Sequence, residues 1–264
     1  MTDESKIVKL YESKNQLTTD AVDKIVVEIF NKRKDNLAAQ TIVLTGCSPL
    51  VGTTSTCIGL GIAIATTQRR TLLIDCDVRK SIKYKKLNDN TSVGVANYLV
   101  QDGCDESLQV DDIIYPTNIN NLSYIPCGNC NESSTRILCS TRMGKLLEAV
   151  REKFDCVIFD FPSLAVVPDA QILFNEVDGI VLLAALGETR KKQIREAKMK
   201  VAPYLDKYYG MIINKVRLDV YKKNVRDYNY YFVDKEGEQK FKGNAAYKKY
   251  KKNVAQTGGE QEDE

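Results

Sequence analysis

The sequence of 264 residues contains no histidine. This absence excludes Ser-His-Asp and Cys-His catalysis, and it excludes every metal site that needs a histidine ligand. Long apolar runs are also absent, because no stretch reaches the roughly 18 residues that a transmembrane helix needs. The first residues, MTDESKIVKLYESKNQL, are polar and lack the apolar region of a signal peptide. We therefore expect a cytoplasmic protein.

The eight cysteines are expected to be reduced thiols, because cytoplasmic proteins seldom keep disulfides. One Cys-x-x-Cys pair occurs, at Cys127 and Cys130, and Cys139 follows it. A zinc site without histidine needs four good ligands, and the chain has no second pair of this kind. The sequence therefore favours a cysteine-tolerant loop over a zinc site.

Apolar runs alternate with segments of helical spacing along the middle of the chain. Strands are expected at residues 41–46, 70–77, 154–162, 179–186 and 208–216, and helices at 20–34, 53–67, 141–153 and 188–205. Continuously apolar strands that alternate with helices indicate an α/β fold, a mostly parallel sheet with helices on both faces. Ligands of such sheets bind at the carboxyl ends of the strands. Four residues at predicted strand ends are expected to converge on one rim: Gly46, Asp75, Asp160 and Asn214.

The segment LTGCSPLVGTTSTC, residues 44–57, is typical of a phosphate-binding loop between a strand and a helix. We take Gly46 and Gly52 as the glycines of the G-x-x-x-x-G-K-S/T motif and Thr54 as its hydroxyl residue. Thr53 occupies the lysine position, and residues 35–79 contain no lysine. Such loops hold phosphates through backbone N–H groups and a helix N-terminus, which do not depend on lysine. The expected ATP- or ADP-binding residues of the loop are Gly46, Gly52, Thr53, Thr54 and Ser55.

Three aspartates lie at the ends of apolar strands. Asp75 and Asp77 belong to LLIDCDVRK, and Asp160 belongs to VIFDFP. Buried carboxylates need a cation or a hydrogen-bond network, and hard oxygen ligands suit Mg²⁺. We expect these three carboxylates and the Thr54 hydroxyl to form one magnesium site, with Thr54, Asp75 and Asp160 as the metal ligands.

The composition of the chain changes near residue 217. Residues 215–254 carry twelve Lys and Arg against five Asp and Glu, and nine of the fourteen tyrosines follow residue 203. This basic segment can meet an anionic membrane surface, at about 1 kcal/mol for each basic residue. Nucleic acid is not the favoured partner, because the net charge is only +3 and the excess of basic residues lies in this one segment.

Together these motifs resemble those of the bacterial tyrosine kinase family, the cytoplasmic P-loop kinases of capsule and exopolysaccharide assembly. SPLVGTTST corresponds to the family's Walker A loop, LLIDCDVRK to its distinctive Walker A′ motif, and FDCVIFDFPSLAVVPDA to its Walker B segment. The resemblance runs through most of residues 18–216. It implies a P-loop NTPase-like fold, with an N-terminal segment and helix over 1–40, the P-loop domain over 41–216 and a tyrosine-containing tail over 217–264.

The resemblance also implies roles for single residues. Asp75 and Asp77 would act near the acceptor hydroxyl and Mg²⁺, Asp160 would serve Mg²⁺, and Asn214 would touch the adenine. The protein would transfer phosphate from ATP to its own tail and work with a membrane adaptor of polysaccharide export, peripheral at the inner face of the membrane. The candidate phosphoacceptors are Tyr221, Tyr228, Tyr230, Tyr231, Tyr247 and Tyr250.

Two features depart from the family pattern. Thr53 replaces the Walker A lysine, whose place Arg79 or a partner's lysine would have to fill. The family's E-x-x-R-x-x-R oligomerisation motif is matched only by Asp20, Asp23 and Val26, so both arginines are lost. We therefore expect no stable ring through this helix, but a monomer or a different dimer.

Three hypotheses follow from these residues. The first is a tyrosine-protein kinase that phosphorylates its own tail, and the second is a catalytically impaired nucleotide-binding or scaffold pseudokinase. The third is a partition-type ATPase that meets a surface through its basic tail. The tyrosine cluster favours the kinase over the partition-type ATPase, unless those tyrosines serve only as packing residues. Thr53 favours the pseudokinase over the active kinase.

Overall fold

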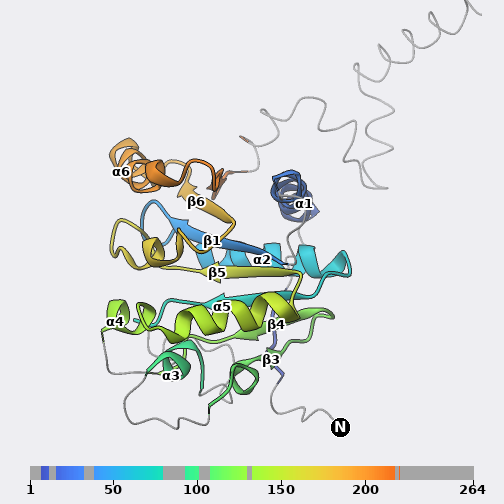
Figure 1. Cartoon of the computed structure of the whole chain (residues 1–264). Coiled ribbons are helices and arrows are strands. Elements are labelled where there is room, and N and C mark those ends of the chain that lie inside the picture. The colour runs from blue at the N-terminus through green and yellow to red at the C-terminus, as the bar shows by residue number, and fades with distance from the viewer. Residues whose placement is uncertain are drawn as a thin grey trace, which may run out of the picture. The chain divides into compact units, whose positions relative to one another are not determined.

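The structure of the chain is a computed structural model (Figure 1) that describes residues 7–11, 16–32, 39–79, 93–100, 108–129, 133–217 and 220. The chain divides into two compact units, Met1–Lys215 and Val216–Glu264. All the helices and strands described below belong to the first unit. Cys130 and the six candidate phosphoacceptor tyrosines lie outside the described residues.

A seven-stranded sheet in the order β3-β4-β2-β5-β1-β6-β7 forms the centre of the first unit. The strands are β1 (Gln40–Gly46), β2 (Thr71–Asp75), β3 (Tyr115–Pro116), β4 (Leu122–Ile125), β5 (Cys156–Asp160), β6 (Gly179–Ala185) and β7 (Tyr208–Asn214). Every strand pair is parallel except the pair of β3 with β4 at one edge. The predicted α/β fold with a mostly parallel sheet is therefore confirmed.

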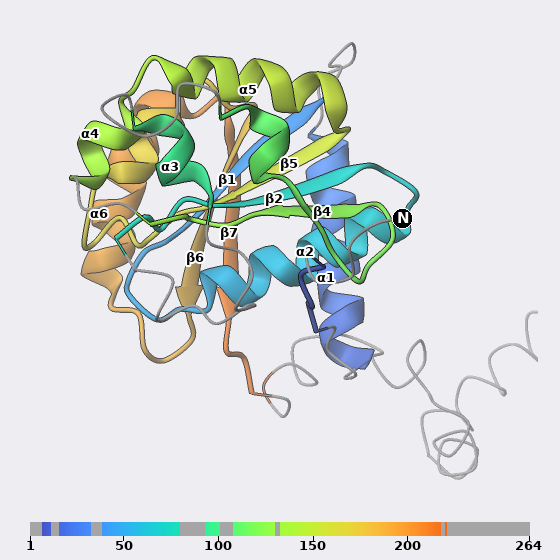
Figure 2. The same cartoon turned by 90° about the horizontal axis from the view of Figure 1, so that it is seen from below.

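Helices cover both faces of the sheet, with α1 and α2 on one side and α3, α4 and α5 on the other (Figure 2). The helices are α1 (Gln16–Asn31), α2 (Thr53–Thr66), α3 (Val95–Leu99), α4 (Ser134–Leu138), α5 (Arg142–Lys153) and α6 (Lys191–Val201). Short 3₁₀ turns are η3 (Val110–Ile113), η4 (Asp169–Leu173) and η5 (Ala202–Tyr204). Among the described residues, no helix has both the length and the apolar composition that a membrane crossing requires.

The strands alternate their side chains between two apolar cores, as a strand buried on both faces must. In β1, Ile42 and Leu44 join the core under α1 and α2, while Val43 joins the core under the other helices. Each such side chain contributes roughly 1.5–3 kcal/mol when it is fully buried. This packing holds the central strands in register, and the register positions their carboxyl ends.

The structure adds elements that the sequence did not predict. Leu122–Ile125 forms the parallel strand β4, where the sequence predicted no strand. The helix before the loop begins at Gln16 and packs on α2, so it shares a unit with the sheet. Val26, at the last position of the expected oligomerisation motif, is only 5% exposed and lies in the core.

Gly179, the first residue of β6, faces the ring of Tyr209 in β7. A Cβ atom at this position would lie 2.5 Å from Cε2 of that ring. The ring has little freedom to move, because Gln40 Nε2 donates a hydrogen bond to its hydroxyl at 3.3 Å. The contact explains why this strand begins with glycine.

We expect Gly179→Ala to destabilise the fold by about 1–3 kcal/mol, because the new methyl group overpacks the site. Urea denaturation monitored by circular dichroism measures the change. Gly144→Ala is the matched control, since a Cβ there meets no atom within 4 Å and α5 should gain up to about 1 kcal/mol. Equal stabilities of the two variants would contradict the role assigned to Gly179.

Candidate nucleotide-binding site

The loop of the candidate site connects the end of β1 to the start of α2. Five residues separate Gly46 from Gly52, one more than the four of the G-x-x-x-x-G motif, so the two glycines do not have standard spacing. Both still require glycine. A Cβ at Gly46 would lie 2.8 Å from the Ser48 carbonyl oxygen, and Gly52 has a φ of 88°. The loop keeps its tight turns although its two glycines stand one residue further apart than in the motif.

Hydrogen bonds from three neighbouring segments fix the loop. The Cys47 N–H donates to the Leu183 carbonyl of β6 at 2.7 Å. Asn214 Nδ2, at the end of β7, donates to the Val51 carbonyl at 2.8 Å, and the hydroxyls of Ser48 and Thr189 lie 2.8 Å apart. The loop is therefore held by the protein itself, before any ligand binds.

The first turn of α2 starts directly after Gly52. Its opening residues are Thr53, Thr54 and Ser55, and the Gly52 carbonyl accepts hydrogen bonds from Thr56 N at 3.0 Å and Thr56 Oγ1 at 2.9 Å. The first N–H groups of a helix have no partner within the helix and carry partial positive charge. A phosphate at this end would meet these groups, as the sequence predicts.

Asp75 and Asp160 are the final residues of β2 and β5 and pair directly across the parallel ladder. Each is at most 3% exposed. By strand alternation both side chains lie on the face that α2 covers, because Leu73 and Ile158, two residues earlier, belong to that core. Gly46 and Asn214 also end parallel strands, so all four strand-end residues share one rim.

Asp77 contacts this pair from the loop after β2. Its backbone N–H donates to Asp75 Oδ1 at 3.0 Å, and Asp77 as a whole is 5% exposed. This short turn orients the Asp75 carboxylate through the main chain and leaves the Asp77 side chain at the same rim.

Tyr124 is a residue of the site that the sequence did not indicate. Its hydroxyl donates to Asp75 Oδ2 at 3.4 Å from the neighbouring strand β4. Burial raises the pKa of Tyr124 well above its usual value, and the nearby Asp75, Cys127 and Asp160 raise it further. The phenol is therefore a neutral donor beside the buried carboxylates. Its only signal in the sequence is its place two residues before Pro126.

The carboxylates fit Mg²⁺ in a limited way. Within the described ranges, no group of three or more Asp, Glu, Cys or His side chains is arranged to hold a metal ion. Mg²⁺ commonly uses one or two carboxylates together with substrate phosphates and water. Asp75 and Asp160, side by side on the face of α2, meet that smaller requirement, and Thr54 lies in the first turn of this helix.

Arg79 does not supply a free charge to the loop. Its Nε and Nη2 atoms donate to Asp169 at 3.1 and 3.3 Å, and Thr135 Oγ1 donates to the same carboxylate at 3.2 Å. The Asp169 side chain is 1% exposed, so it needs this pairing. In this arrangement Arg79 neutralises Asp169 and does not replace the missing lysine.

Cys47 lies in the loop but is no nucleophile. Burial raises the pKa of its thiol to about 11, and the charge of Lys198 offsets only part of this increase. Because the thiolate is the reactive form, Cys47 stays protonated and inert near neutral pH. It serves the loop through its backbone N–H.

A groove of about 540 Å³ reaches the outer side of the loop between α1 and α2. Ser55, Thr56 and Asn214 line its end nearest the loop. Two of the predicted nucleotide-binding residues, Ser55 and Asn214, therefore border open space.

We expect Tyr124→Phe to destabilise the fold by about 1 kcal/mol, because the buried Asp75 carboxylate loses a donor while the aromatic ring remains. Chemical denaturation at neutral pH measures this loss. Tyr11→Phe removes a hydroxyl from a residue that is 85% exposed and should have no effect. An unchanged stability of Tyr124→Phe would show that the phenol is not needed by Asp75.

Comparison with known proteins identifies the family. A family model described as an AAA domain matches residues 39–182. Tyrosine-protein kinase CpsD of Streptococcus agalactiae serotype III (strain NEM316) is 30% identical over 192 residues, which cover 72% of this chain and 79% of CpsD. The BceF tyrosine kinase domain superposes with a TM-score of 0.64 at 26% identity, over 76% of this chain and 78% of that chain.

The fold extends to more distant proteins. Cobyrinic acid a,c-diamide synthase from Mycobacterium smegmatis, solved with an ATP analogue and magnesium, superposes with a TM-score of 0.52 at 16% identity, over 66% of this chain and 72% of that chain. This likeness concerns the fold alone. The CpsD match covers most of both chains, and the residues matched by the family model include the loop and all three aspartates. The chain therefore belongs to the bacterial tyrosine-protein kinase family that its motifs resemble.

Proposed function

We propose that this protein binds ATP or ADP with Mg²⁺ at residues 46–55, and that it is a tyrosine kinase relative with weak phosphoryl transfer. The observation that carries the proposal is the loop itself. Backbone groups of the loop and of the N-terminus of α2 form the proposed phosphate cradle. Gly52 adopts a left-handed conformation there, and the Asn214 side chain holds the Val51 carbonyl. A cradle of this kind binds anions without a lysine side chain.

Each residue has a defined part in the proposed site. N–H groups of the loop and of Thr53, Thr54 and Ser55 would surround the phosphates. The Thr54 hydroxyl, Asp75 and Asp160 would hold Mg²⁺, which neutralises phosphate charge when bound. Asp77 would act with Asp75 at the acceptor hydroxyl.

Asn214 would contact adenine in addition to holding the loop. One N–H of its side-chain amide already bonds the Val51 carbonyl. The amide oxygen and the second N–H are the groups through which it would meet the donor and acceptor edge of the base. Its position beside the groove between α1 and α2 supports this role.

The weak step is the transfer of phosphate. A positive group at the transferring phosphate is commonly worth about 10³–10⁵ in rate, or roughly 4–7 kcal/mol. Thr53 carries no charge, and Arg79 is engaged by Asp169. These two observations favour a second candidate function, a nucleotide-binding scaffold that does not turn over ATP.

The biological setting of the proposal comes from the family resemblance. We propose a link to capsular or exopolysaccharide biosynthesis, with a membrane adaptor as partner and the tail tyrosines as acceptors if the kinase is active. The excess of basic residues over 215–254 would hold the cytoplasmic protein at an anionic membrane surface.

We expect ADP and ATP to bind in the presence of Mg²⁺, with a dissociation constant near or above about 1 µM. Isothermal titration calorimetry measures this affinity with the full chain. Gly52→Ala serves as the comparison, because its φ of 88° is strained for any side chain and a Cβ would lie 2.5 Å from Asn214 Nδ2. Folded wild-type protein that binds neither nucleotide at millimolar concentration would end the proposal.

We expect Thr53→Lys to raise tyrosine autophosphorylation by about 10³-fold or more, because a lysine there reaches the β- and γ-phosphates. Radiolabelled ATP and detection of phosphotyrosine measure the reaction. Asp77→Asn in the same background should abolish the gain if the acceptor side is intact. No gain with Thr53→Lys, despite tighter ATP binding, would reject the kinase and leave the scaffold.

A further inference from the structure

The outer edge of β7 lacks a partner strand among the described residues. Its seven residues, YYGMIIN, contain no charged side chain and no proline. Soluble proteins normally protect a free sheet edge with charges, proline or a covering segment, because its N–H and C=O groups otherwise recruit another strand. β7 is therefore a surface prepared for pairing.

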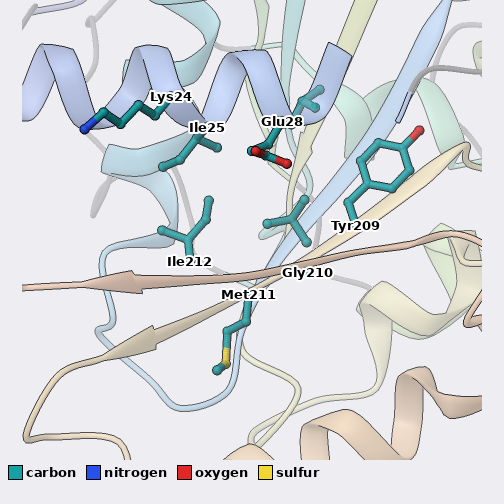
Figure 3. Close-up of a pocket in the computed structure, with 9 residues that line it drawn as sticks. Lys24, Ile25, Glu28, Tyr209, Gly210, Met211 and Ile212 are labelled. Atoms are coloured by element: carbon teal, nitrogen blue, oxygen red, sulfur yellow. The ribbon is translucent and has the colours of Figure 1, made fainter. Parts of the chain in front are cut away.

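A groove of about 310 Å³ runs beside this edge, between β7 and α1. Figure 3 shows the α1 side chains Lys24, Ile25 and Glu28 above the strand. Lys24 lies toward the Ile212 end of the groove and Glu28 toward the Tyr209 end (Figure 3). The walls are mainly apolar, and the two ends carry charges of opposite sign.

This arrangement is self-complementary. A two-fold axis through the middle of β7 would set the strand antiparallel to its copy and bring the two α1 helices to the same face of the joined sheet. Lys24 of one copy would then face Glu28 of the other, and the reverse. In a two-fold dimer the same surface of each subunit meets its copy. Opposite charges on either side of the axis then attract each other across the interface.

Further residues at this edge support the contact. Ile213 is 43% exposed near the carboxyl end of β7, and Leu205 is 69% exposed just before the strand. Exposed apolar side chains in and next to an edge strand favour association. The alternative surface on α1 is poor, because Asp20, Asp23 and the buried Val26 stand where the family carries its ring motif.

We propose that two copies of this chain form a symmetric dimer through antiparallel pairing of their β7 edges, with reciprocal contacts of Lys24 and Glu28. The two sheets become one continuous sheet. Because Asn214 ends β7 beside the phosphate loop, the two nucleotide sites lie toward opposite ends of the paired strands. The proposed nucleotide-binding residues of each site all belong to one subunit, so assembly and nucleotide binding are separable.

Sedimentation velocity of the full chain, at concentrations up to about 100 µM, tests the dimer. We expect Ile213→Lys to raise the dimer dissociation constant by about tenfold or more, because a charge on an edge strand opposes pairing. Val166→Lys is the matched control, an apolar residue 62% exposed in the loop after β5, and it should leave the dimer intact. Circular dichroism verifies that each variant is folded.

A charge exchange tests the register of the contact. Lys24→Glu or Glu28→Lys alone should weaken the dimer by about tenfold, because like charges then meet across the axis. The double variant, Lys24→Glu with Glu28→Lys, should restore the affinity to within about threefold of wild type. A monomeric wild type, a dimer insensitive to Ile213→Lys, or a double variant that fails to recover would each overturn the proposal, as would a ring.

Discussion

The parallel register of β5 with its two neighbours is the constraint on which the candidate site depends. Asp160 pairs with Asp75 of β2 on one side and with Leu44 of β1 on the other. Since β1 continues into the phosphate loop two residues later, this register sets both the carboxylate pair and the loop at the same rim. The apolar side chains of the strands hold the register from both faces, and a slip by one residue would turn the aspartates away from α2.

The site that results is anchored by hydrogen bonds, but position 53 of its loop carries no positive charge. Cys47, Ser48 and the Val51 carbonyl are tied to β6, to Thr189 and to Asn214, so the loop keeps its shape through the protein alone. Thr53 carries no charge, and Arg79 is paired with Asp169. In the proposed function, binding and catalysis therefore separate: backbone groups of the loop would bind phosphate, while Thr53 would not supply the charge that speeds its transfer.

Much of this fold could be predicted from the sequence, and the exceptions have physical reasons. The central strands were predictable because strands buried on both faces are continuously apolar, as in TIVLTG and GIVLLAA. The residues at the carboxyl ends of these strands could be predicted from the same apolar runs, because each run ends where its strand ends. β4 was missed because four residues carry too little periodicity, and Tyr124 was missed with it. The pairing of Arg79 with Asp169 joins residues 90 apart in the sequence, and no local pattern reports such a contact. The spacing of Gly46 and Gly52, one residue wider than in the motif, is visible in the sequence itself.

The central claim is that backbone groups and the Asn214 anchor, and not a side chain at position 53, give the loop its affinity for phosphate. Calorimetric titration of Mg²⁺-ADP and of inorganic pyrophosphate into wild type, Thr53→Ala and Asn214→Ala tests it most directly. Pyrophosphate separates loss of the loop's shape from loss of an adenine contact. The account predicts that Thr53→Ala binds both ligands within about threefold of wild type, whereas Asn214→Ala weakens both by about tenfold or more. Loss of binding in Thr53→Ala, together with unchanged pyrophosphate binding in Asn214→Ala, would contradict it.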